Sequence, residues 1–227
     1  MQHTLNFLFL HPSQTLYQQG FHRFTFSMMK TFSYILFYKP FQVLSQFSAE
    51  GDKKTFANFF SDIEKNIYPV GRLDYDSEGL ILLTNDTRLN QQLLNPERLH
   101  QKTYYVKVEG IPSKEMLQQL TEGVIISVNG KPHKTAPSKV VVINAPENIP
   151  ERNPPIRFRK NIPTSWISLT ITEGKNRQVR KMTAAVGLPT LRLIRYSIGS
   201  VTIGEMQPGD FLYLRSNLIR KLLQPLT

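Results

Sequence analysis

The sequence contains no cysteine, no long hydrophobic run and comparatively few acidic residues. Without cysteine the chain can form no disulfide, no thiolate metal site and no cysteine nucleophile, which is compatible with a reducing cytoplasm. No apolar run approaches the roughly 20 residues that cross a bilayer, so we expect no integral membrane protein. The 17 acidic residues stand against 28 basic ones, and the net charge of +11 favours an acidic partner such as nucleic acid or an anionic membrane.

The length of 227 residues and the 40% hydrophobic content are sufficient for one large domain or two small lobes. Residues 1–29 contain no acidic residue, and they lack both the basic flank of a signal peptide and the arginine content of a transit peptide. We expect them to form an N-terminal extension that is poorly ordered or arises from an early start codon. The main domain is expected at residues 30–215, followed by a C-terminal tail at 216–227.

Strand and helix patterns follow one another irregularly along the chain. Strands are indicated where β-branched and aromatic residues run between turn residues, and helices where a capping residue or a terminal glycine frames the pattern. The predicted strands are 33–38, 80–83, 103–108, 139–143, 165–171, 191–203 and 211–214, and the predicted helices are 55–63, 87–94, 113–120 and 176–186. Because these elements do not alternate as βαβ units, we expect an α+β fold with a mainly antiparallel sheet and two lobes around a cleft.

Three carboxylates, Asp74, Asp76 and Glu78, crowd one turn between two apolar segments. A carboxylate in such a turn can act as a nucleophile or bind a cation. The spacing matches the start of a calcium-binding EF-hand loop, but position twelve is Asn85 instead of a bidentate glutamate, and the flanks have strand patterns. A solvated turn without a chemical role is the other alternative.

A second charged stretch, residues 173–182, is rich in lysine and arginine and lies about 100 residues downstream. On the predicted helix, Arg177, Arg180 and Lys181 fall within about 100° of one another, and apolar residues occupy the opposite side. A cationic helix face and an acidic turn together indicate chemistry on a polyanion. The alternative is a solvated helix face.

Tyr104 and Tyr105 are neighbours on a predicted strand, so their side chains point to opposite faces, one towards a cleft and one towards the core. An aromatic ring in a basic cleft can stack on a nucleobase. Simple packing of both rings is the alternative. The five histidines show no H-x-x-x-H spacing, so the sequence does not favour metal-dependent hydrolysis.

Considered together, these motifs resemble the ribosomal pseudouridine synthases of the small-subunit type. The motifs that carry this resemblance are residues 71–80, 102–104 and 173–182. Further matches, which look like the branch of large-subunit pseudouridine synthase E, lie at 37–40, 153–157, 162–166 and 191–196. Tyr38 departs from the asparagine usual in that branch, and residues 1–29 are too short for the amino-terminal RNA-binding module of many relatives.

The resemblance covers residues 31 to 214 approximately, and it implies both a fold and an activity. The implied fold has a central mixed, mostly antiparallel sheet with flanking helices and a cleft between two lobes, so that residues 30–215 form the catalytic domain. The implied activity is isomerisation of a uridine to pseudouridine in large-subunit (23S) ribosomal RNA. A non-catalytic ribosome-assembly factor that binds ribosomal RNA with the same fold is the alternative, and a calcium-binding module is a third.

The resemblance also implies the residues of the site. Asp74 corresponds to the nucleophilic aspartate, Tyr104 to the tyrosine that stacks on uracil and assists proton transfer, and Arg180 to the basic residue paired with the aspartate. Whether Asp74 attacks the ribose or the base stays open. We expect substrate binding by seven further basic residues, namely Lys39, Arg72, Lys102, Arg177, Lys181, Arg192 and Arg195.

No cofactor and no metal are implied. The expected partner is large-subunit ribosomal RNA or a pre-ribosomal particle. We expect a cytoplasmic monomer that does not bind a membrane.

Overall fold

The computed structural model describes residues 32–157, 160–215 and 219. These residues all belong to the second of two units into which the chain divides, Phe32–Thr227. The extension expected at residues 1–29 lies outside the described residues, as does the tail expected at 216–227 except for residue 219. None of the helices in the described part of the chain is long and apolar enough to span a bilayer.

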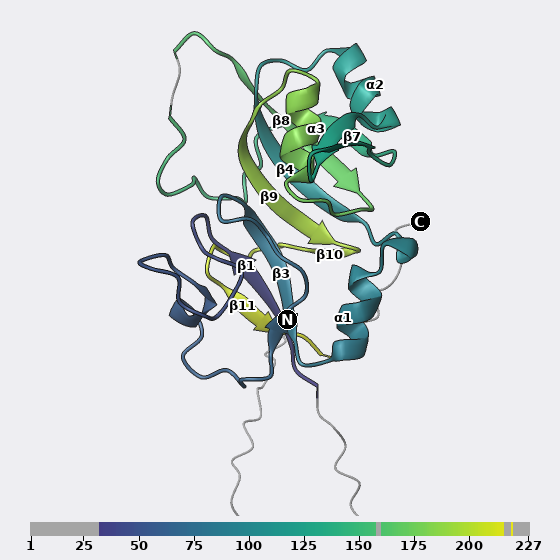
Figure 1. Ribbon diagram of the computed structural model, residues 1–227. Helices are drawn as coiled ribbons and strands as arrows, with labels where there is room; N and C mark the ends of the chain where they lie inside the picture. Colours follow the sequence, from purple (N-terminus) through teal and green to yellow (C-terminus); the bar gives the residue numbers. More distant parts are fainter. Residues whose placement is uncertain (1–31, 158–159, 216–218, 220–227) are drawn as a thin grey trace, which may run out of the picture. The chain divides into compact units, whose positions relative to one another are not determined.

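Strands outnumber helices in the described part of the chain (Figure 1). The strands are β1 (Tyr34–Lys39), β2 (Tyr68–Pro69), β3 (Glu78–Thr84), β4 (Lys102–Glu109), β5 (Ile125–Val128), β6 (Lys131–Lys134), β7 (Lys139–Ile143), β8 (Thr164–Ile171), β9 (Thr190–Ile198), β10 (Val201–Thr202) and β11 (Phe211–Tyr213). The helices are α1 (Thr87–Leu94), α2 (Lys114–Glu122) and α3 (Gln178–Ala185), with short 3-10 helices η1 (Phe56–Asn58) and η2 (Pro96–Arg98).

Nine of the described strands form one sheet in the order β11-β1-β3-β9-β4-β8-β7, with β2 beside β3 and β10 beside β9. The β3–β9 pair is parallel and the other described pairs are antiparallel. This parallel pair joins the β11-β1-β3 half of the sheet to the β9-β4-β8-β7 half (Figure 1). The predicted α+β class with a mixed, mostly antiparallel sheet is therefore confirmed.

The contact between the two halves depends on Gly79. Its partner in the parallel register is Arg195 of β9, and a Cβ built on Gly79 would lie only 2.4 Å from the main-chain oxygen of Arg195. The φ of +105° at Gly79 also disfavours any residue with a side chain. Glycine therefore lets β3 approach β9, and this approach brings the acidic turn before β3 next to the second half of the sheet.

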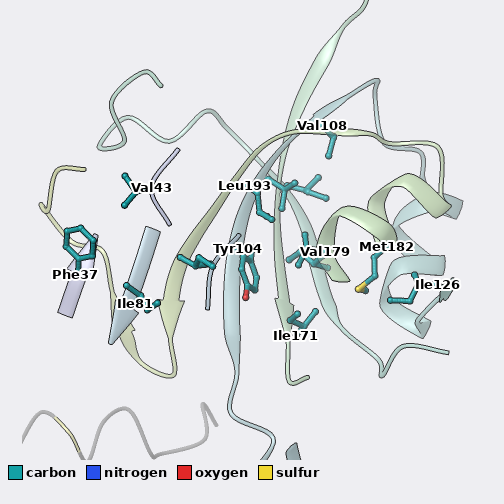
Figure 2. Packing of buried hydrophobic residues seen from close by; sticks show 14 of the residues in the cluster. Phe37, Val43, Ile81, Tyr104, Val108, Ile126, Ile171, Val179, Met182 and Leu193 are labelled. Atoms are coloured by element: carbon teal, nitrogen blue, oxygen red, sulfur yellow. The ribbon is translucent and has the colours of Figure 1, made fainter. Parts of the chain in front are cut away.

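The largest apolar cluster runs through both halves of the sheet and into α3. In Figure 2, Phe37 of β1 and Ile81 of β3 belong to the same cluster as Leu193 of β9 and Met182 of α3, and all four are buried. Strands β1 and β3 are buried almost throughout, which explains why their sequences are apolar runs without alternation. The shared core fixes the loops at the junction of the two halves.

One predicted helix was wrong and one hairpin was missed. The helix predicted at 55–63 is reduced to η1, because the rings of Phe56 and Phe60 pack edge-on against Phe37 at 5.4 and 5.1 Å and hold the segment without a helix. The β5–β6 hairpin was not predicted, although Asn129 and Gly130 form its turn with positive φ of 52° and 77°.

Candidate active site

A cavity of about 840 Å³ lies at the junction of the two halves of the sheet. Its walls come from the acidic turn before β3, the end of α1, the start of β4, the loop before α3 and β9. This volume is in the usual range for sites that bind small organic molecules. Six of the ten predicted site residues line it: Arg72, Asp74, Lys102, Tyr104, Arg177 and Arg195.

The main chain around Asp74 is fixed by a neighbouring loop. The Ser45 hydroxyl donates to the Leu73 carbonyl at 2.7 Å and accepts from the Leu73 amide at 3.1 Å. The Gln42 amide donates to the carbonyl of Tyr75 at 2.9 Å. The carboxylate of Asp74 is 34% exposed and lines the cavity, so the turn presents this group on a rigid backbone.

The ion pairs of the turn differ from the prediction that Arg180 pairs with Asp74. Arg177 makes a bidentate pair with Asp76, at 2.9 and 2.8 Å, and approaches Asp74 less closely, at 3.6 Å. Arg180 donates from Nη2 to the main-chain oxygen of Asp76 at 2.6 Å, and its Nε lies 3.3 Å from the Asp76 carboxylate without hydrogen-bond geometry. Arg180 is thus bound to Asp76 in this structure, and its pairing with Asp74 stays a prediction.

Asp76 binds both Arg177 and Arg180, a role that was not predicted from the sequence. Desolvation alone raises the pKa of Asp76, but the hydrogen bonds and charge of Arg177 and the charge of Arg180 outweigh it, so that the pKa is lowered. The hydrogen bond to Asp76 correspondingly raises the pKa of Arg177. The only signal in the sequence was the position of a second acid two residues after Asp74.

Arg177 occupies an unusual main-chain position. It precedes α3 in the left-handed region, with φ 53° and ψ 31°, whereas the helix was predicted to begin at residue 176. Gln178, the first residue of α3, accepts from the Lys175 amide at 2.8 Å and donates to Glu173 at 2.6 Å, which stabilises the preceding loop. Arg177 therefore precedes the helix and, contrary to the prediction, does not share a helix face with Arg180 and Lys181. Lys181 donates to the Ser127 carbonyl of β5 and does not line the cavity.

Tyr104 and Tyr105 point to opposite sides of β4, as predicted. Tyr104, which belongs to the buried cluster drawn in Figure 2, is 8% exposed and lines the cavity. Tyr105 packs on the other side, where its ring stacks on Tyr196 with 4.1 Å between centroids and 11° between planes. Of these two rings, Tyr104 is therefore the one that a molecule in the cavity can contact.

Lys102 and Arg195 form a cationic wall of the cavity. The Lys102 ammonium donates to the His100 carbonyl at 3.3 Å, and Arg195 donates from Nε to the Leu80 carbonyl at 2.6 Å. Nη2 of Arg195 is buried without a hydrogen-bond partner among the described residues. Desolvation, followed by the charge of Arg195, lowers the pKa of Lys102 to about 8. Within the described part of the chain neither cation has a carboxylate partner, so this wall is suited to an anion.

Lys39 does not lie in the cavity, contrary to the prediction that it binds substrate. It is completely buried, and its ammonium donates to the carbonyls of Pro40 and Val43 at 2.9 and 2.7 Å. Desolvation lowers its pKa to about 7, although the charge of Glu78 opposes this shift. The contacts of Lys39 hold its own loop together, so the structure does not bring Lys39 to the other predicted site residues.

Arg192, also predicted to bind substrate, is likewise buried and does not line the cavity. It is 5% exposed, forms a bidentate pair with Glu78 at 2.8 and 2.7 Å and donates to the Pro150 carbonyl at 2.9 Å. The carboxylate of Glu78, the third acid of the turn, is therefore paired with Arg192 and does not lie with those of Asp74 and Asp76. In the described residues no group of three or more His, Cys, Asp or Glu side chains could hold a metal ion.

Comparison with known proteins agrees with the fold. The sequence profile described as RNA pseudouridylate synthase matches residues 33–185. A Vibrio parahaemolyticus protein named ribosomal large subunit pseudouridine synthase E is 51% identical over 177 residues, which cover 78% of this chain and 71% of that relative. A protein with the same name from Xanthomonas campestris is 46% identical over 179 residues, covering 78% of this chain and 92% of the relative.

A solved structure described as a crystal structure of pseudouridylate synthase is similar in three dimensions. The aligned region covers 86% of this chain and 75% of the chain in that structure, with a TM-score of 0.69 and 26% sequence identity. Profile, relatives and structure agree, and the chain belongs to the RNA pseudouridylate synthase family, whose members are isomerases.

Proposed function

We propose that this protein converts a uridine of large-subunit ribosomal RNA to pseudouridine, with Asp74 as the nucleophile and without a cofactor. The substrate class is supported by the names of the relatives from Vibrio and Xanthomonas, which are 51% and 46% identical to this chain. The observation that carries the proposal is that Asp74 and Tyr104 line one cavity together with a cationic wall. Residues 30–215 would form the catalytic domain, which agrees with the profile match at 33–185.

The reaction requires a group that retains one fragment while the other rotates. The bond from N1 of uracil to C1′ of ribose breaks, a bond from C5 to C1′ forms, and overall one proton leaves C5 and one is gained at N1. Atoms and electrons balance without an oxidant or a second substrate. A carboxylate can form the covalent intermediate that such an exchange needs. Attack by Asp74 on the ribose or on the base would each meet this requirement.

The cavity can also compensate for the free energy of extracting the nucleotide. A base that leaves its stack loses a few kcal/mol, and stacking on Tyr104 would recover roughly 1–3 kcal/mol. Five basic residues line the cavity, Arg72, Lys102, Lys175, Arg177 and Arg195, against three acidic ones, Glu50, Asp74 and Glu173. This excess of positive charge favours the RNA backbone.

Arg180 has a different place in this proposal from the one implied by the family resemblance. Its guanidinium binds the main-chain oxygen of Asp76, two residues from Asp74. The charge of Asp74 still acts on it, since burial lowers the pKa of Arg180 and the carboxylates of Asp76 and Asp74 oppose that shift. We assign Arg180 to fixing the acidic turn and to supplying positive charge near Asp74.

The test is a reaction of purified protein with a large-subunit ribosomal RNA transcript, in which pseudouridine is measured by mass spectrometry of the digested RNA. We expect product from the wild-type protein, and we expect Asp74→Asn to bind the RNA but to make no product. Asp62→Asn, at an exposed aspartate that does not line the cavity, is the matched control and should react normally.

Product formation by Asp74→Asn at the wild-type rate would remove Asp74 from the role of nucleophile. RNA binding by the wild-type protein without any pseudouridine would instead support the non-catalytic assembly factor.

A further inference from the structure

Asp76, which does not line the cavity, holds two arginines beside the proposed nucleophile. Its carboxylate accepts two hydrogen bonds from Arg177, at 2.9 and 2.8 Å. Its main-chain oxygen accepts from Arg180 at 2.6 Å, and Nε of Arg180 lies 3.3 Å from its carboxylate. Asp74 has a single longer contact, 3.6 Å from Arg177. The guanidinium groups near the turn are therefore bound to Asp76 more closely than to Asp74.

Asp74 and Asp76 compete for the same guanidinium. Arg177 Nη1 is 2.9 Å from one oxygen of Asp76 and 3.6 Å from Oδ2 of Asp74. A bidentate arginine–carboxylate pair engages both carboxylate oxygens and is among the stronger ion pairs in proteins. If Arg177 formed that pair with Asp74, both oxygens of the proposed nucleophile would be occupied. In the observed arrangement Asp76 takes the bidentate pair, and the Asp74 carboxylate remains accessible.

The main chain prevents Arg177 from simply leaving this region. Its left-handed conformation is uncommon for a residue with a side chain, so the surrounding contacts must stabilise it. The Gln178 side chain, bound to the Lys175 amide and to Glu173, fixes the loop on both sides of Arg177. The Arg177 side chain is 42% exposed and can therefore move between two nearby carboxylates.

Other charged groups near the turn do not replace this contact. Desolvation lowers the pKa of Lys39, and the charges of Asp76 and Asp74 are near enough to oppose that shift. The Lys39 ammonium is, however, bound to two carbonyl oxygens and not to either carboxylate. Arg180 is bound to Asp76 through its main-chain oxygen. Arg180 also lies 3.3 Å from the Asp76 carboxylate but makes no hydrogen bond to it, so Arg177 is the cation whose position depends most on that carboxylate.

We propose that Asp76 is a positioning residue that holds Arg177 away from the Asp74 carboxylate, so that Asp74 stays near positive charge but free to react. This inference rests on the proposed role of Asp74 as nucleophile. It predicts that loss of the Asp76 charge releases Arg177, which then pairs with Asp74 and covers it. Catalysis should suffer more than RNA binding.

The first test is Asp76→Asn, which keeps the shape of the side chain and removes its charge. We expect kcat to fall by at least about tenfold with little change in KM, because a group needed in the reaction step is blocked. Asp76→Glu retains the charge and should keep more activity than Asp76→Asn. Circular dichroism and thermal unfolding of each variant check that the fold is retained.

The second test is the double variant Asp76→Asn with Arg177→Gln. If the released guanidinium covers Asp74, its removal should restore part of kcat, so the double variant should be faster than Asp76→Asn. A merely structural role of Asp76 predicts that the double variant is equally slow or slower. A double variant no faster than Asp76→Asn, or a kcat of Asp76→Asn within about twofold of wild type, would overturn the inference.

The single variant Arg177→Gln tests the inference even if Asp76→Asn does not fold. We expect it to raise KM and to keep kcat within a few-fold of wild type, because Arg177 is held away from the reacting carboxylate. A loss of kcat as large as that of Asp74→Asn would overturn the inference. An active Asp74→Asn would instead contradict the proposed function, so the two failures are distinguishable.

Discussion

At the scale of single residues, burial decides what each basic side chain does. Lys39 and Lys102 both belong to motifs that carry the family resemblance. Lys39 is nevertheless completely buried against carbonyl oxygens, whereas Lys102 lines the cavity. Arg192 and Arg195 differ in the same way: Arg192 is bound to Glu78, whereas a nitrogen of Arg195 is left without a partner among the described residues. The sequence shows the charge of these residues and not their depth, which is why four candidates look equivalent before folding.

Lys39 should make the stability of the protein depend on pH. Desolvation lowers its pKa from 10.5 to about 7 in the folded state. Between these values the unfolded chain binds the proton that the folded chain has lost, so stability rises with pH by up to roughly 1.4 kcal/mol per unit. From pH 7 to 9 we expect the free energy of unfolding of the wild type to rise by about 2 kcal/mol relative to that of Lys39→Met.

Urea unfolding of both proteins at several pH values measures this difference. Lys39→Met loses two hydrogen bonds and will be less stable at pH 9, but its own curve lacks the contribution of this titration. Parallel curves for the two proteins between pH 7 and 9 would show that Lys39 remains charged throughout.

At the scale of elements, the close approach of β3 and β9 makes Gly79 irreplaceable. Gly79→Ala would place a methyl group against the main chain of Arg195 and force a side chain into φ +105°. We expect a loss of roughly 2–5 kcal/mol in the free energy of unfolding, from the strained backbone and the steric overlap together. Gly174→Ala is the control, since nothing lies within 4 Å of its Cβ position. Equal unfolding midpoints in urea for both variants would contradict this account.

Elements with local signals were predictable, and elements without them were not. Helix α1 has the predicted bounds because Asp86 accepts from the amides of Arg88 and Leu89 at 3.0 and 3.1 Å, an N-cap that is visible in the sequence. Strand β6, with its sequence KPHK, has little strand character and forms by pairing with β5. The choice of Arg177 between Asp74 and Asp76 depends on the left-handed turn before α3, for which no residue gives a local signal.

At the scale of the whole molecule, the short β3–β9 contact turns two distant charged stretches into one site. Residues 76 and 177 are 101 positions apart, yet their side chains form a bidentate pair. The order of the strands explains this, because β3 and β9 are neighbours in the sheet although β4 to β8 lie between them in the chain. The excess of basic residues then surrounds a cavity that already contains the acidic turn.

This arrangement predicts how salt should affect RNA binding. If Lys102 binds a phosphate, replacing it with methionine removes one contact, and the slope of log affinity against log salt should become shallower by about 0.7, the value per phosphate of a single strand. Measurements would use Asp74→Asn as the background, so that no product forms during titration. Lys65→Met, at an exposed lysine that does not line the cavity, is the control and should leave the slope unchanged. An equal slope for the Lys102 and Lys65 variants would show that the Lys102 charge contacts no phosphate, and the cationic wall would then need a different anionic partner.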